Sequence, residues 1–180
     1  MAQLPDPRPT FDAAGWAVYN ELAGPRGGVG AMYLTLLNHP PLAQHIGQLG
    51  TFLRFAGLLP GDVRELAILA TARSLGVAYE WQQHVPTALQ AGLPQDIVDQ
   101  LQRGDIAGAQ MSTLYADVWQ AARHVAAQEC LPEALQQRLL QSLGLKGVVE
   151  LVALCGFYRC IATVVTAFDV APADPGPTPF

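Results

Sequence analysis

The sequence is poor in cysteine, and this shortage excludes several classes of protein. Its three cysteines, Cys130, Cys155 and Cys160, form neither a C-x-x-C pair nor a metal-type spacing. Cys155 and Cys160 lie five residues apart on one expected helix, so they point to different faces of it. We therefore expect the cysteines to act as small apolar residues in packed helices. We expect the protein to have neither a metal site nor a cofactor.

Charged residues are also scarce, which limits the possible partners. They make up 14% of the 180 residues, the net charge is −5, and the basic residues are scattered singly. Nothing in this pattern favours nucleic acid or an anionic membrane as a partner. Residues 1–10 are polar and rich in proline, with no apolar signal segment. We expect a cytoplasmic protein.

Strand patterns are almost absent, and helical periodicity predicts an all-α multihelical bundle. Proline or aspartate marks the expected helix starts, and glycine marks the stops. The predicted helices span residues 11–23, 31–37, 41–58, 62–75, 78–91, 94–102, 111–127, 132–142 and 145–168. The last is broken by charged residues, so we expect a core or interface helix and not a membrane span. The expected organisation is an arm (1–10), a single helical domain (11–170) and a proline-rich tail (171–180).

Glu65 and His84 are the most informative polar residues, because each lies on an otherwise apolar helical stripe. A turn at Gly76 would fold the two segments into an antiparallel hairpin and set the residues nearly level. A carboxylate and an imidazole that meet inside a helical bundle can carry out acid–base chemistry. A buried structural pair is the alternative interpretation, because buried ionisable groups are costly unless they are paired or used.

Three stretches resemble the carboxymuconolactone decarboxylase-like family, which includes alkylhydroperoxidase D: RELAILATAR (64–73), YEWxxHxP (79–86) and AGL (91–93). LxxPPLA (37–43) resembles an upstream helix start, and GxxELVxLxxFY (147–158) resembles the last helix of the family. The likeness covers roughly residues 10–170. It implies an all-α fold that assembles into homo-oligomers, as dimers, trimers or hexamers.

The resemblance also implies which chemistry the chain can support. The hydroperoxidase branch uses a glutamate, a C-x-x-C pair and a histidine, which would fall at Glu65, at Val77 and Glu80, and at His84. Dithiol reduction of peroxides needs two thiols, and this chain has no cysteine at either of those two positions. The decarboxylase branch works without cysteines or a cofactor, and its chemistry fits this chain better.

The predicted catalytic residues are therefore Glu65 and His84, with Glu80 one turn before His84 to orient the ring. Tyr79, Trp81 and Val77 are the predicted lining of a substrate pocket, although core packing is an alternative for the two aromatic residues. We expect a cofactor-independent decarboxylase-type lyase for a small carboxylated lactone or keto-acid-like substrate. The alternatives are an alkylhydroperoxidase-like redox protein that uses another thiol, and a non-enzymatic oligomeric binding protein.

Overall fold

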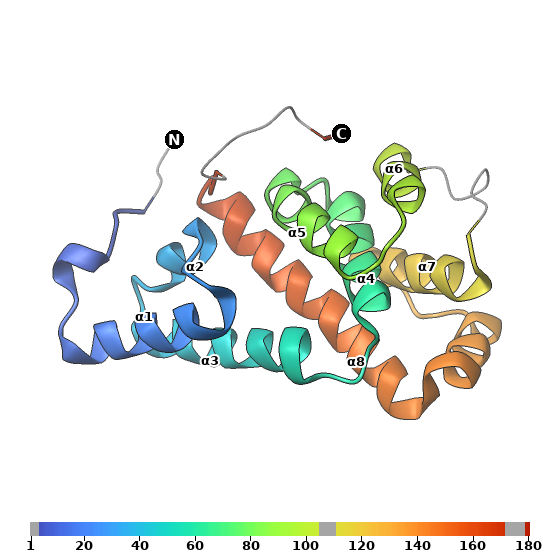
Figure 1. Ribbon diagram of the computed structural model, residues 1–180, viewed down its shortest axis with the longest axis horizontal. Coiled ribbons are helices and arrows are strands. Elements are labelled where there is room, and N and C mark those ends of the chain that lie inside the picture. The colour runs from blue at the N-terminus through green and yellow to red at the C-terminus, as the bar shows by residue number, and fades with distance from the viewer. Residues whose placement is uncertain (1–3, 105–110, 172–178) are drawn as a thin grey trace. The chain divides into compact units, whose positions relative to one another are not determined.

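The computed structural model describes residues 4–104, 111–171 and 179–180, and these form helices without a strand (Figure 1). The predicted all-α class is thereby confirmed. Two compact units can be distinguished. The first contains residues up to Gly57 and a segment that begins at Thr163, and the second contains residues 58–162 with the end of the chain.

The first unit contains α1 (Ala13–Arg26), α2 (Ala31–Leu36), α3 (Pro40–Thr51) and the π-helical turn η2 (Phe52–Ala56). The close packing of α1 on α3 depends on Gly47. A Cβ atom there would lie 1.9 Å from Leu22 Cδ2, so only glycine fits without a shift of the leucine.

The second unit is built around α4 (Gly61–Leu75), which packs against α5 (Ala78–Gln90), α6 (Gln95–Arg103) and α7 (Thr113–Ala127). Every residue of α4 from Glu65 to Ala72 is buried. The last helix, α8 (Glu133–Ala167), lies in this unit up to Ala162. Tyr158, Leu151 and Leu154 are among its buried residues.

Local capping explains where the helices begin and end. The side chain of Asp12 accepts a hydrogen bond from the Gly15 N–H, and the side chain of Ser112 accepts one from the Tyr115 N–H. Gly76 ends α4 in the left-handed conformation, with φ at 68°, a backbone shape that glycine adopts without strain.

Most predicted helices are found, and the larger differences concern α1, α3 and α8. The predicted stop at Gly24 is wrong, because α1 continues through Pro25 to Arg26, whose side chain donates to the carbonyls of Leu22 and Gly47. The predicted helix 41–58 is α3 followed by the π-helical turn. The predicted stop at Gly144 is present as a break in backbone conformation within α8, with φ at 69° and ψ at 171°.

By length and composition α8 could cross a membrane, since an 18-residue window has a mean hydropathy of 1.9. However, 56% of that window is buried inside the protein, as in the central helix of a folded bundle. The same helix, α8, also carries a buried carboxylate. Glu150 is buried and accepts hydrogen bonds from the N–H groups of Leu58 and Leu59, at 2.8 and 3.0 Å. This ties the segment before α4 to α8.

Candidate functional site

The turn at Gly76 brings α4 and α5 together as a hairpin, as the sequence predicts. The N–H of Val77 donates to the carbonyl of Ala72, and the N–H of Gly76 donates to that of Arg73, so the last carbonyls of α4 are satisfied. The chain reverses there, and α5 begins at Ala78. Figure 1 shows the two helices beside each other in green.

Glu65 and His84 meet across this hairpin. His84 Nδ1 lies 2.8 Å from Glu65 Oε2. The carboxylate residue is fully buried and the histidine is 5% exposed. With Glu65 ionised, Nδ1 is the donor of this hydrogen bond, because the carboxylate has no hydrogen to give. The predicted approach of the two groups is confirmed.

Tyr158 of α8 completes the group, and sequence reasoning missed its role. Its hydroxyl lies 3.1 Å from His84 Nε2, and the two rings pack edge to face with centroids 5.0 Å apart. Tyr158 lies 74 positions from His84, so no local spacing could link them. The only available signal was its place in the final-helix motif, in a run of otherwise apolar positions.

Two further charged groups surround the pair. Arg64 Nε lies 3.3 Å from Glu65 Oε1, within ion-pair distance of the carboxylate. Glu80 Oε2 lies 3.8 Å from His84 Nε2, within ion-pair distance but beyond a hydrogen bond. Glu65 and Tyr158 contact the two ring nitrogens at hydrogen-bond distance, and the orienting role of Glu80 stays a prediction.

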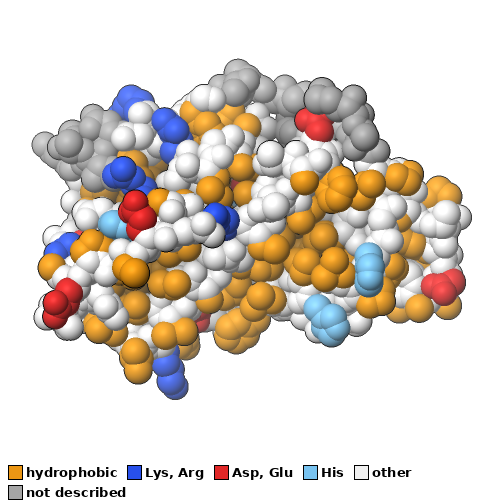
Figure 2. All heavy atoms as spheres, turned by 180° about the vertical axis from the view of Figure 1, so that it is seen from behind, with side chains coloured by type: hydrophobic (Ala, Val, Ile, Leu, Met, Phe, Trp, Pro, Cys, Tyr) orange, Lys and Arg blue, Asp and Glu red, His pale blue; other side chains and the backbone are white. Residues whose placement is uncertain are grey.

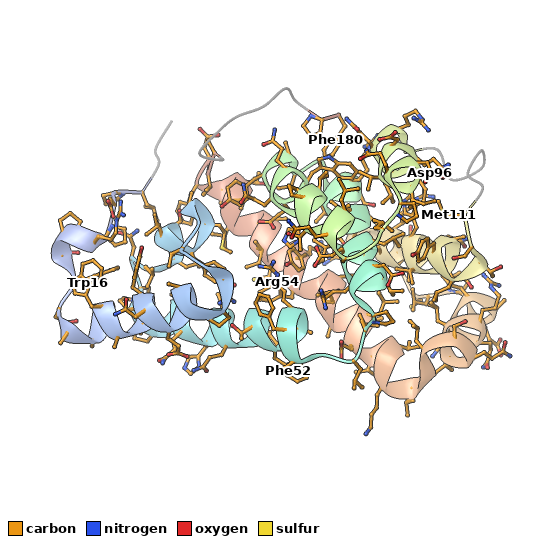
Figure 3. All side chains as sticks on the ribbon, viewed as in Figure 1. Trp16, Phe52, Arg54, Asp96, Met111 and Phe180 are labelled. Atoms are coloured by element: carbon orange, nitrogen blue, oxygen red, sulfur yellow. The ribbon has the colours of Figure 1, made fainter. Side chains whose placement is uncertain are left out.

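The predicted pocket residues lie on the same turn of chain, and all are buried. Val77 caps α5, and Tyr79 and Trp81 lie on its first turn. The Phe180 ring packs edge to face on Trp81, with centroids 5.5 Å apart. Figure 3 labels Phe180, whose ring also lies 4.9 Å from the guanidinium carbon of Arg73.

Two hollows on the described residues lie away from the pair. One, of about 580 Å³, is formed by Ser74 and the C-terminal half of α7, including His124. Another, of about 250 Å³, lies in the first unit beside Arg8. Neither is lined by Glu65 or His84, so a substrate pocket beside the pair stays a prediction.

Neither the cysteines nor the residue types that bind metals gather into one site in the described part of the chain. Cys155 is buried, and burial raises the pKa of its thiol to about 11, against opposing hydrogen bonds from Thr71 and the backbone. Cys130 and Cys160 are exposed and unpaired. Among the described residues, no cluster of three or more His, Cys, Asp or Glu is arranged to hold a metal ion.

Comparisons with known proteins agree with this architecture. Over 96% of this chain, the fold matches the alkylhydroperoxidase AhpD core of an uncharacterized peroxidase-related protein from Ralstonia eutropha JMP134. The TM-score is 0.79 and the identity 18%, over 93% of that chain. The debrominase Bmp8 matches with a TM-score of 0.66 and 15% identity, both in its apo form and as a cysteine-to-alanine variant in complex with 2,3,4-tribromopyrrole. The matches cover 91–93% of this chain and 86–88% of the Bmp8 chains.

These structures define the class as an all-α protein with the AhpD-like core fold. The carboxymuconolactone decarboxylase family model matches residues 40–128, which contain Glu65 and His84. The chain is therefore a carboxymuconolactone decarboxylase-like protein. No curated protein matches it significantly. At these identities the solved structures establish the fold alone, and their activities remain those of the named proteins.

Proposed function

We propose that the protein is a cofactor-independent lyase that decarboxylates a small carboxylated lactone or keto-acid-like substrate. The observation that carries this proposal is the buried contact between Glu65 and His84, at 2.8 Å. An imidazole oriented by a carboxylate in a site shielded from water is a typical arrangement for general acid–base catalysis.

For this decarboxylation the protein has to supply only a proton donor and a group that stabilises the donor's protonated form. Cleavage of the C–CO2 bond leaves its electron pair on the substrate, where a conjugated carbonyl takes it up as an enolate. The enolate carbon then needs one proton, which a protonated His84 can supply and solvent can replace. The Glu65 carboxylate stabilises the imidazolium while it holds that proton.

The positions of the thiols favour this chemistry over dithiol peroxide reduction. Val77 and Glu80 stand where the resemblance would place the reactive cysteines, and neither can form a thiolate. Cys155 is a poor substitute, since its pKa of about 11 keeps the thiol neutral at pH 7. The match to a peroxidase-related protein reflects a shared fold at 18% identity and carries no thiol to this chain.

The test is CO2 release from carboxylated lactones and β-keto acids, with the substrate consumed in equal amount. We expect Glu65→Gln and His84→Ala to lose turnover while remaining folded, and His124→Ala to behave as wild type. Hydroperoxide with a dithiol reductant serves as the competing assay, with Cys155→Ser and Cys130→Ser as its variants. Peroxide turnover that disappears in either cysteine variant, with no CO2 release, would replace the lyase with the redox function.

We also propose that the protein is a homo-oligomer that uses the exposed face of α8. Leu145, Val149 and Val152 are 71%, 62% and 36% exposed and recur at helical spacing. Gly156 and Cys160 continue the same face and are exposed as well. Apolar side chains also cover much of the surface seen in Figure 2. An apolar stripe of this length is costly in water and favours association.

Sedimentation of the wild type and of Val149→Glu tests this second proposal. We expect a species larger than the 19.2 kDa chain for the wild type. We expect dissociation for Val149→Glu, because it places a charge in the stripe. Gln137→Glu adds the same charge at an exposed position outside the stripe and should leave the assembly unchanged. A wild-type monomer at micromolar concentration contradicts the proposal.

A further inference from the structure

We infer that Tyr158 is a catalytic residue, and that its hydroxyl, rather than His84, exchanges the proton with the substrate. This inference rests on the proposed lyase function and assigns its final proton-transfer group. It follows from the way in which both nitrogens of the His84 ring are occupied by buried partners from two other helices, α4 and α8.

The direction of the hydrogen bonds follows from elementary chemistry. With Glu65 ionised, Nδ1 must carry the ring proton and donate it to the carboxylate. In the neutral ring Nε2 is then an acceptor, so the Tyr158 hydroxyl donates to it at 3.1 Å. The order is phenol, imidazole, carboxylate, which is the order of a triad in which an imidazole activates a hydroxyl.

Tyr158 also occupies the ring nitrogen through which His84 could act on a substrate directly. Nε2 is the only nitrogen that does not face Glu65, and the tyrosine hydroxyl already contacts it. The Glu80 carboxylate lies 3.8 Å from the same nitrogen and would repel a carboxylate substrate placed there. In the proposed step the proton therefore passes to the substrate through the phenol, which is already in contact with His84.

The packing holds the phenol in this position. Tyr158 is 4% exposed, and its ring packs edge to face on both His84 and Phe157, with centroids 5.0 and 5.5 Å apart. A rigidly packed donor loses little freedom when it reacts, and this favours proton transfer. Side chains placed this way on regular helices keep their geometry better than side chains on loops.

The proposed step balances as follows. The C–CO2 bond breaks, CO2 leaves, and its bonding pair becomes the enolate of the substrate. The phenolic proton of Tyr158 moves to the enolate carbon. Solvent then protonates Nε2 of the neutral His84 ring, and the imidazolium so formed passes that proton to the phenolate, which restores the starting state. One proton is consumed for each CO2 released, and nothing is oxidised or reduced.

The first experiment needs no substrate. Side-chain ¹⁵N NMR of His84 should find the neutral ring protonated on Nδ1, with Nε2 as an acceptor. Tyr158→Phe should shift the Nε2 resonance. Tyr115→Phe, which removes a hydroxyl bonded to Asp62 instead, should not. A neutral ring protonated on Nε2, or an Nε2 resonance unmoved in Tyr158→Phe, overturns the inference whatever the activity.

The second experiment measures CO2 release by the full-length protein. Tyr158→Phe keeps the ring and its packing, so a folded variant with kcat lowered by about 100-fold or more and KM little changed supports the inference. Tyr115→Phe should keep wild-type kinetics. Replacement of Tyr158 by 3-fluorotyrosine lowers the pKa of the phenol, and the alkaline limb of the kcat profile should move to lower pH. A purely structural tyrosine would leave that limb in place.

The outcomes separate this inference from the proposed function. If Tyr158→Phe turns over like the wild type while Glu65→Gln and His84→Ala do not, the lyase stands and Tyr158 is not its proton carrier. If the wild type releases no CO2 from any substrate, the lyase and the catalytic role of Tyr158 both fall. The NMR result then shows only whether the hydrogen-bond chain exists as a structural feature.

Discussion

The contact between Glu65 and His84 should be one of the stronger single interactions in the protein. Both side chains are buried, so water cannot replace either partner. Glu65→Ala leaves the imidazole buried without its acceptor, and removing one member of a buried pair costs about 3–5 kcal/mol. Glu65→Gln keeps the volume and one acceptor oxygen, so its cost should be smaller, about 1 kcal/mol, the difference between a charged and a neutral hydrogen bond.

A double-mutant cycle isolates the pair. Glu65→Ala, His84→Ala and the double variant should give a coupling energy of about 1.5–3 kcal/mol, as for hydrogen bonds to charged groups. The assay is denaturant unfolding at one fixed protein concentration, because the apparent stability of an oligomer depends on concentration. The slope of the unfolding free energy against denaturant concentration, the m value, should be the same for the four proteins. Differences between their midpoints then report differences in stability.

His124 and Glu129 provide a matched control pair. Their Nδ1 and Oε2 atoms lie 3.1 Å apart, but the Glu129 side chain is 63% exposed. Exposed pairs of this kind contribute about 0–1 kcal/mol. If the coupling between Glu65 and His84 is no larger than that of this control, the reasoning from burial is refuted.

Three further outcomes are expected. Gly47→Ala should destabilise the fold in thermal unfolding by about 1–2 kcal/mol, because overpacking against Leu22 outweighs the gain in helix propensity, and it should be neutral or stabilising in a Leu22→Ala background. Burial, then the hydrogen bond to Asp62, raises the pKa of Tyr115 from 10.0 to about 12. Because the folded state favours the neutral phenol, this stabilisation is complete below pH 10 and is lost as the pH rises towards 12, and Tyr115→Phe should flatten that loss in alkaline unfolding curves. In a thiol titration, Cys155 should react only after unfolding, and a reaction in the native state would contradict its burial.

Helix positions could be predicted because their signals are local. Gly76 and Gly144 mark breaks in the helices, and Ser112 caps α7 in the usual way. The predicted end of α1 lies three residues too early, because Gly27 and not Gly24 takes the left-handed cap conformation, with φ at 70°. Which of several nearby glycines ends a helix is not decided by the local pattern alone, and the Arg26 side chain of the added turn is held by the carbonyl of Gly47, 21 positions away.

The sequence by itself determined the all-α class, the family and the meeting of Glu65 with His84. The class and the meeting of the two residues depend on periodicity and spacing within short stretches, and a turn at Gly76 leaves a hairpin few ways to form. The family depends on the resemblance of the motifs around Glu65 and His84. Only the tertiary structure placed Tyr158 on the second ring nitrogen and Glu80 beyond hydrogen-bond distance. The reason is physical: which side of α8 meets α5 is decided by packing of whole helix faces, and no short-range pattern encodes that choice.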